Sequence, residues 1–428
     1  MTAGLRMTSA PPTPSLPLPV PESGKLQNQS VEALGRTIVM GWLIAHRFPQ
    51  EDAAAVAQAR AQMLDILQQQ FSEFVWYMPF VQRYESLHST IEEPITLLDE
   101  GVQERDIQRW DYVLVITQAN LRSYYKPYAL GTPSRAVSVA VLSTARLAPP
   151  YFPAASDNEE RAVSLARRIC ALGLHLLGDL NGLPHDDDPQ TFMHVPEASE
   201  DLDRMSHYTP SQHEQLRQEL SDAADLRLEE RPEAARGGIA LFYLRAMRIG
   251  AGEIISAVVQ AEPWQFPLRL SRLTTAAIST LLLLLVTAEA WDLGMSQPPL
   301  FVAQFSLLTL LGTSGFIVKR QRVLLRRGRR RLTEQTVVTN VAMSVVVFLG
   351  MATTYIVLFL LTLVLSHVLF SYTLVAGWAV SQQGRIAPSH YLVFSAFVAS
   401  LGIVIGALGA SFELPSYFRH IAYVDEET

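Results

Sequence analysis

The chain has one cysteine and three lysines, and both scarcities narrow its possible functions. Because Cys170 is the only cysteine, the fold cannot depend on an intramolecular disulfide, and this thiol is expected to be a small core residue. Arginine supplies almost all of the positive charge, yet the net charge is −7. No basic face precedes residue 270, so nucleic acid is not expected as a partner. The first residues lack a charged start followed by an apolar core, which argues against a cleavable signal peptide.

Hydrophobic residues are abundant but unevenly placed. They make up 49% of the 428 residues, a length that allows about two or three domains. Nearly all of the apolar excess follows residue 270. Residues 1–30 are rich in proline, serine and threonine and have too few apolar side chains for a core, so they are expected to form a disordered tail. The sequence therefore predicts a soluble N-terminal domain followed by a membrane region.

Residues 35–230 have the pattern of an α/β domain. The segment Tyr112–Thr117 is a continuous apolar run, which is typical of a strand buried on both faces. Strands that alternate with amphipathic helices indicate a layered α/β fold. We expect strands at 37–48, 74–84, 112–117 and 137–142, and helices at 51–71, 95–110, 159–180 and 209–228.

A short stretch at the end of the helix over 159–180 has the spacing of a metal site. His175 and Asp179 are four residues apart and therefore lie on one helix face. Gly182 can take a left-handed conformation that ends the helix, and Pro184 prevents the helix from restarting. The chain can then turn back and bring His185 beside the other two side chains. Two imidazoles and a carboxylate suit a zinc-sized ion.

This stretch resembles the zinc motif of the metzincin peptidases, which reads His-Glu-x-x-His-x-x-Gly-x-x-His. His175, Gly182 and His185 match the motif, whereas Asp179 stands at the second histidine and Leu176 at the glutamate. The resemblance implies a metzincin-like α/β fold, in which a mixed sheet packs against an active-site helix. It also implies zinc as the cofactor, with His175, Asp179 and His185 as its ligands. Carboxylate oxygen is an acceptable zinc ligand.

Downstream residues extend the resemblance. The segment Phe192–Pro196 looks like the family's Met-turn, with Met193 as its methionine, and the helix over 209–228 looks like the closing part of the fold. The order of elements is closest to that of the archaemetzincins and covers roughly residues 35–230. A packed helix end with a capping aspartate is the purely structural alternative. Asp186–Asp188 is expected to be a solvated loop, and His194 and His207 are expected to be surface or turn histidines.

Leu176 decides between the functional hypotheses. The family glutamate takes a proton from zinc-bound water, and leucine has no titratable group. The leading hypothesis is a membrane-tethered pseudopeptidase that binds an unknown protein or peptide partner and has no catalytic residue. One alternative is an active zinc-dependent metallopeptidase with an atypical ligand set and a base from elsewhere in the fold. A second alternative is a transporter with a regulatory soluble domain, although the apolar segments hold little buried charge.

The second half of the chain predicts a connector and a membrane region. Residues 231–268 form an amphipathic helical connector, and Trp264 with neighbouring arginines is typical of a membrane interface. Residues 269–412 form the transmembrane region, and the fold class is completed by an all-α bundle of about four helices. Each expected span holds about 18 or more largely apolar residues. The spans are placed at 273–290, 300–318, 337–370 as one long helix, and 391–412.

The second loop of the membrane region predicts the orientation. It carries a run of basic residues without an acid, which the positive-inside rule places in the cytoplasm together with the N-terminal domain and the tail over 413–428. The excess of arginine is typical of a GC-rich bacterial genome, so the expected location is the bacterial cytoplasmic membrane. Membrane lipid is the expected partner of this loop. Its basic residues are Lys319, Arg320, Arg322, Arg326, Arg327, Arg329, Arg330 and Arg331.

Overall fold

The computed structural model describes most of the chain from Arg36 onward. The disordered tail expected at 1–30 lies outside the described residues. The described ranges are 36–83, 89–124, 126–148, 158–224, 239–324, 334–383, 385–412, 419–420, 423–424 and 427–428.

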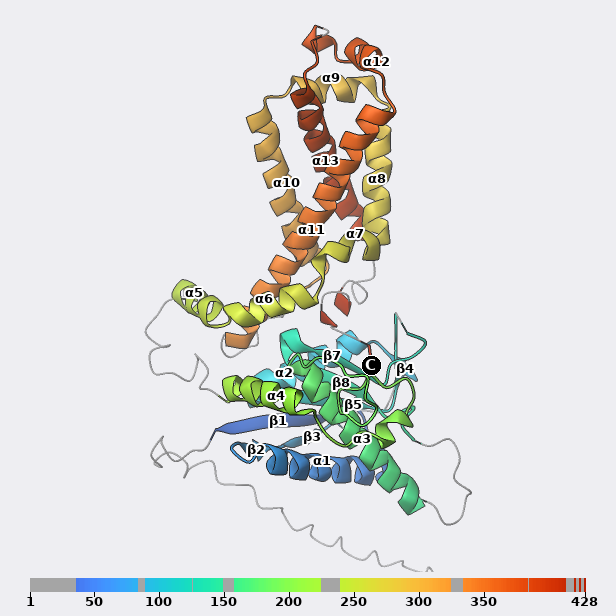
Figure 1. The fold of residues 1–428 in the computed structure, drawn as a ribbon, viewed down its shortest axis with the longest axis vertical. Helices are drawn as coiled ribbons and strands as arrows, with labels where there is room; N and C mark the ends of the chain where they lie inside the picture. The colour runs from blue at the N-terminus through green and yellow to red at the C-terminus, as the bar shows by residue number, and fades with distance from the viewer. Residues whose placement is uncertain are drawn as a thin grey trace, which may run out of the picture. The chain divides into compact units, whose positions relative to one another are not determined.

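A mixed β-sheet forms the centre of the N-terminal part (Figure 1). Its strands follow the order β2-β1-β5-β8-β7, and β3 also pairs with β1. All of these pairings are parallel except that of β7 with β8, so β7 is an antiparallel edge strand. The strands are β1 (Thr37–Ile44), β2 (Val75–Tyr77), β3 (Phe80–Gln82), β5 (Tyr112–Thr117), β7 (Gly131–Ser134) and β8 (Val139–Ser143), and a small second sheet pairs β4 (Ile91–Glu92) with β6 (Asn120–Leu121).

Helices cover both faces of this sheet because the buried strand residues alternate between two cores. In β5, Leu114 belongs to the core that holds α1 (Gln50–Gln70) and α3 (Asn158–Leu180). Its neighbour Val115 belongs to the core that holds α2 (Pro94–Gln108). Successive side chains of a strand point to opposite faces, so a strand that is apolar on both faces needs helices on both sides. The predicted α/β layers are confirmed.

Two features of the sheet differ from the sequence prediction. The strand expected at 74–84 is divided into β2 and β3, and Pro79 lies between them. The Pro79 carbonyl still accepts a hydrogen bond from the Trp42 amide at 2.8 Å, so the edge continues across the break. The edge strand β7 was not predicted. Its four residues, Gly131–Ser134, contain a proline and lack the apolar alternation by which strands are recognised.

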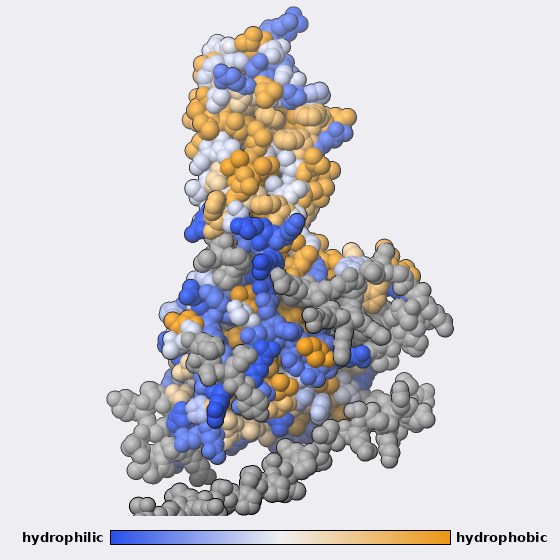
Figure 2. Space-filling view, turned by 180° about the vertical axis from the view of Figure 1, so that it is seen from behind, coloured by the Kyte–Doolittle hydropathy of each residue, from blue (hydrophilic) through white to orange (hydrophobic). Residues whose placement is uncertain are grey.

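Helices make up the second half of the chain, and Figure 2 shows that their exposed surface is largely hydrophobic. The expected long span is one helix of 35 residues, α11. The spans expected at 300–318 and 391–412 correspond to α10 and α13. The helices are α5 (Ile239–Ile249), α6 (Ala251–Gln260), α7 (Phe266–Arg269), α8 (Ser271–Leu285), α9 (Ala288–Ser296), α10 (Pro299–Arg320), α11 (Glu334–Val368), α12 (Tyr372–Trp378) and α13 (Pro388–Ala410).

Three described helices, α10, α11 and α13, are long and apolar enough to cross a membrane. A fourth span exists only if two helical segments, 254–269 and 271–285, count as one span bent by 51°. The single helix expected at 273–290 is interrupted, because α8 ends at Leu285 and α9 begins at Ala288. The Trp291 indole donates a hydrogen bond to the Leu285 carbonyl at 2.8 Å and so satisfies one of the acceptors at this helix end.

Candidate metal centre

The end of α3 has the geometry that its sequence predicts. The Leu183 amide donates to the Gly178 carbonyl at 3.1 Å, and the Gly182 amide donates to the Asp179 carbonyl at 2.9 Å. These two bonds form a Schellman motif, which requires a left-handed residue after the last helical turn. Gly182 supplies it with φ +66°. The chain therefore leaves the helix at a fixed angle and turns back toward the Asp179 face.

This turn brings His175, Asp179 and His185 together. One potential ligand atom from each lies within 4.8 Å of the other two. His175 Nε2 lies 3.3 Å from Asp179 Oδ2, and His185 Nε2 lies 3.1 Å from Asp179 Oδ1. The two imidazole rings are nearly parallel, with centroids 5.5 Å apart. Among the described residues, no other group of three or more histidine, cysteine or acidic side chains converges in this way.

A hydrogen bond of His175 Nδ1 orients the imidazole ring so that Nε2 faces Asp179. His175 Nδ1 lies 2.7 Å from the Phe192 carbonyl oxygen, which can only accept, so Nδ1 carries the proton. Nε2 is then the ring atom that faces Asp179, 3.3 Å from its Oδ2. Buried His175 Nε2 and Asp179 Oδ2 have no hydrogen-bond partner among the described residues. Buried polar atoms placed in this way are stabilised when a proton or a cation lies between them, so the donor set fits a metal ion.

Burial differs across the three side chains and leaves the centre open on one side. The His175 side chain is 0% exposed and that of Asp179 is 7% exposed, whereas the His185 side chain is 31% exposed. An ion held by the three side chains would therefore be reached from the side of His185. Three protein ligands with one open position are typical of zinc centres that bind a further molecule.

The loop after the motif lies under the centre. Met193 is fully buried in the core of α3, and its carbonyl accepts from the Asp186 amide at 3.0 Å. Tyr208 donates its hydroxyl to the Leu174 carbonyl at 2.7 Å. Burial raises the pKa of Tyr208 well above its usual value, and the charge of Asp179 adds to the effect. Tyr208 is therefore a neutral donor that fastens this loop to the helix.

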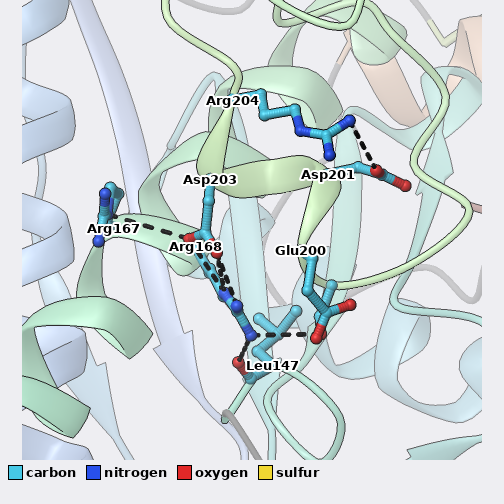
Figure 3. A network of polar contacts seen from close by, with 8 residues as sticks. Leu147, Arg167, Arg168, Glu200, Asp201, Asp203 and Arg204 are labelled. Carbon is cyan, nitrogen blue, oxygen red and sulfur yellow. Dashed lines mark hydrogen bonds and ion pairs between the residues drawn. The ribbon is translucent and has the colours of Figure 1, made fainter.

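A second anchor holds the same loop (Figure 3). Arg168 lies on α3, and its side chain is 5% exposed. It donates to both carboxylate oxygens of Asp203 in the short helix η2 (Asp201–Asp203), at 2.6 Å and 3.1 Å, and to the Leu147 carbonyl at 3.0 Å. Arg204 lies 4.0 Å from Asp201 on the outside of the same turn. The bidentate pair fixes η2 against the helix that carries the centre.

Leu176 occupies the position of the motif's glutamate and belongs to the core. It is fully buried, and a Cβ added to Gly131 of β7 would lie 3.0 Å from its side chain. The glycine lets the edge strand approach the helix closely at this point. A carboxylate at position 176 would therefore meet β7 and the apolar core, and this position supplies no base.

The remaining polar residues of the motif region lie outside the centre. Asp186 and Asp188 accept hydrogen bonds from backbone amides of their own loop, at 3.0 Å each, as expected of a loop. His194 Nδ1 lies 3.2 Å from the Asp186 carbonyl, and exposed His207 lies 3.1 Å from the Ser206 hydroxyl. The prediction that these two histidines belong to turns or to the surface is confirmed.

Part of the basic loop can be placed. Lys319 and Arg320 end α10, and Arg322 follows with φ +52°. All three side chains are exposed. The other predicted basic residues, Arg326, Arg327, Arg329, Arg330 and Arg331, lie outside the described residues.

Burial excludes the single thiol from the chemistry of the centre. Cys170 is buried on α3, and desolvation raises its pKa to about 12. A thiol with that pKa stays protonated at neutral pH, and a protonated thiol is neither a nucleophile nor a metal ligand. The prediction that Cys170 is a core residue is confirmed.

Sequence reasoning missed the groups that orient these side chains. The Phe192 carbonyl, Asn181, which accepts from the Tyr112 hydroxyl at 2.7 Å, and the pair of Arg168 with Asp203 were not singled out. Arg168 lies beside Arg167 in the sequence, and the spacing of the residues does not show which of the two has a buried partner. A backbone carbonyl has no sequence signature.

No family model matches, and no curated protein sequence matches. Among solved structures the chain is similar to an archaemetzincin from Methanopyrus kandleri, with 21% identity and a TM-score of 0.33, over 44% of this chain and 97% of that one. A zinc-dependent peptidase from Methanocorpusculum labreanum matches with 18% identity and a TM-score of 0.31, over 41% and 99% of the two chains. An archaemetzincin from Archaeoglobus fulgidus, solved with malonate, matches with 14% identity and a TM-score of 0.27, over 42% and 99%.

Proposed function

We propose that residues 36–224 form a zinc-binding domain that is anchored to a membrane and binds a peptide segment of a partner protein without hydrolysing it. The observation that supports a bound metal ion is the convergence of His175, Asp179 and His185. Two buried polar atoms of this group have no hydrogen-bond partner among the described residues. Zinc accepts two imidazoles and a carboxylate as ligands, whereas magnesium and calcium prefer ligand sets made of oxygen.

Each side chain has a separate role in this proposal. His175 is held by the Phe192 carbonyl so that Nε2 faces the ion. Asp179 supplies the negative charge between the two rings, and His185 closes the site from the solvent side. A bound zinc ion would act as a Lewis acid toward a carbonyl oxygen of the partner. The open side at His185 is where that oxygen would enter.

The absence of hydrolysis rests on Leu176. Peptide cleavage requires a base that takes a proton from water and returns it to the leaving amine. The residue that follows His175 is a buried leucine against Gly131, and the group of three contains no further carboxylate among the described residues. Binding without turnover is therefore the function that this donor set supports.

Membrane anchoring rests on the long apolar helices of the second half of the chain. With four spans, the N-terminal domain and the basic loop share the cytoplasmic side of a bacterial inner membrane. The exposed basic side chains at the end of α10 would then lie against anionic lipid headgroups.

Metal analysis of the purified full-length protein tests the proposal directly. We expect about one zinc ion per chain in the wild type. His175→Ala and His185→Ala should each weaken zinc binding roughly tenfold or more, because each removes one of three protein ligands. His207→Ala is the matched control, since this exposed histidine lies outside the centre, and it should bind zinc like the wild type.

Two outcomes would contradict the proposal. Zinc content that stays the same in both ligand variants would remove the metal site. Cleavage of unstructured peptides that a chelator abolishes, and that a mock purification lacks, would instead show an active metallopeptidase with a base from elsewhere in the fold.

A further inference from the structure

The last residues of the sequence contact the N-terminal sheet although they follow the membrane helices. Arg419 forms a bidentate ion pair with Asp99 of α2. Tyr423 is 2% exposed and donates its hydroxyl to the Val323 carbonyl, just after α10. Described residues of this segment therefore contact both the α/β domain and the residues that follow α10.

The carboxylate of Glu427 is buried and surrounded by hydrogen-bond donors. Its side chain is 1% exposed. Its carboxylate accepts hydrogen bonds from the Ser123 hydroxyl, from the Tyr124 amide at 2.7 Å and from the Lys126 amide at 3.3 Å. The His420 ring nitrogen Nε2 lies 2.9 Å from the same carboxylate. A buried carboxylate with these donors occupies a site built for an anion.

Thr428 continues the sheet beyond its edge strand. Its amide donates to the Gly131 carbonyl at 3.0 Å, and its carbonyl accepts from the amides of Gly131 at 3.1 Å and Leu130 at 2.6 Å. Mutual amide-to-carbonyl bonds between two residues define a hydrogen-bonded antiparallel pair. Figure 1 marks this end of the chain beside β7. Pairing with an exposed edge is one of the ways in which proteins bind extended peptides.

This edge lies against the helix of the metal centre. Gly131 approaches Leu176, the residue after His175, and a Cβ on Gly182 beyond the helix end would lie 2.0 Å from the Arg135 guanidinium, just after β7. The strand therefore runs beside α3 along the two turns that carry the metal ligands. A peptide that extended the sheet at Gly131 would have to displace Thr428.

We propose that the edge of β7, together with Ser123, Tyr124 and Lys126, is a binding site for an acidic peptide, and that Glu427 and Thr428 of the same chain occupy it. Glu427 supplies the charged anchor and Thr428 supplies the strand pairing. The same C-terminal segment contacts the residues that follow α10 through Tyr423 and Val323. The competition with an external partner rests on the proposed function, whereas the internal docking does not.

Accessibility of position 428 tests the docking in the full-length protein. Thr428→Cys should react slowly with a maleimide, because residue 428 is 3% exposed and the native thiol of Cys170 is buried. Adding Glu427→Gln, which removes the anchoring charge, should accelerate labelling about tenfold or more. Adding Glu214→Gln instead is the control, because among the described residues this exposed acid accepts side-chain hydrogen bonds from Arg217 and Gln218 of its own helix. Labelling of Thr428→Cys at the rate of the urea-unfolded chain would overturn the docking.

A peptide in trans tests the site itself. A dye-labelled peptide with the sequence of residues 422–428 should bind a chain that ends at Phe418 and should not bind the full-length chain, whose site is filled. The same peptide with glutamine at the position of Glu427 should bind the shortened chain about tenfold or more weakly. Equal binding to both chains, or binding to neither, would overturn the proposal. The His175→Ala substitution in the shortened chain separates the two proposals. If the peptide still binds this variant as it binds the shortened chain, the proposed peptide site stands even where the metal centre is lost.

Discussion

At the scale of single residues, the position of Asp179 is the main feature of the site. Its carboxylate lies between the imidazole rings of His175 and His185. Its carboxylate can replace a histidine as a ligand, but it also adds a negative charge that attracts either protons or a metal ion to the same place. Leu176 binds neither a proton nor a metal ion, because its side chain is apolar and buried in the core.

A pair of substitutions separates metal binding from catalysis. Asp179→His should strengthen zinc binding, because it restores three imidazole ligands, but it should leave peptide hydrolysis absent. Adding Leu176→Glu supplies a base, although the buried carboxylate must fit against Gly131, so only weak activity is expected. Zinc titration and cleavage of an unstructured peptide, with and without chelator, measure the two effects. Activity of the single variant equal to that of the double variant would contradict this account.

Cys170 gives a prediction for reactivity and for pH dependence. Its pKa of about 12 in the folded protein lies above the reference value of 9.0. The neutral thiol therefore favours the folded state below pH 9, and this contribution is lost as the pH rises toward about 12. Iodoacetamide should fail to modify the folded protein at pH 8 and should modify it once urea is added. Mass spectrometry measures both, and full alkylation of the folded chain would contradict the burial of this side chain.

At the scale of elements, the loop between α3 and α4 (Pro210–Ala223) is held by polar contacts to the helix it follows. Arg168 binds η2, and Tyr208 binds the Leu174 carbonyl. These contacts fix the segment that offers the Phe192 carbonyl to His175. The loop is therefore as much a part of the centre as the helix, although it contributes no ligand.

Arg168→Ala tests this anchor. Removing a nearly buried guanidinium leaves the Asp203 carboxylate and the Leu147 carbonyl without their donor, which should cost about 2 kcal/mol of local stability. Amide hydrogen exchange over residues 191–208 should then rise roughly thirtyfold. Arg167→Ala is the control, because that side chain is 58% exposed and lies 4.0 Å from Asp203, and it should change exchange little. Equal effects of both variants would mean that Arg168 has no special role.

At the scale of the whole molecule, the α/β domain and the long apolar helices meet at defined contacts. The Thr339 hydroxyl near the start of α11 donates to the Ala136 carbonyl at 2.6 Å, and Gln335 donates to the Ser138 hydroxyl at 3.0 Å. Ala136 lies in the short helix η1 (Arg135–Val137), which follows β7, and Ser138 comes directly after η1. The start of the longest apolar helix therefore contacts the turn that follows the edge strand of the sheet.

Topology is the prediction at this scale. We expect the N-terminal domain, the basic loop near Arg327 and the residue at Thr428 to face the cytoplasm, because the basic loop stays on that side and four spans return the chain to it. Reporter fusions at these three places measure their sides. An external Thr428 with an internal basic loop would exclude four spans, and it would also be incompatible with docking of Thr428 on β7.

Much of the fold could be predicted because it is encoded locally. The apolar run of β5, the amphipathic α3 and the long apolar helices each show their own period within one stretch of sequence. The convergence of His175, Asp179 and His185 also follows from local rules, namely a four-residue helical step and a glycine that ends the helix. Binding of metal at this place stays a prediction.

The sequence by itself determined most of the strands and helices, the three long apolar helices, and which three donors meet at a helix end, because these features depend on neighbours within about one or two turns. Only the tertiary structure decided what surrounds them. The edge strand β7 has no apolar alternation, the Phe192 carbonyl has no side-chain signature, and the pairing of Thr428 with Gly131 joins residues far apart in the chain. Backbone hydrogen bonds between distant segments depend on how the whole chain packs, and residue spacing does not record them.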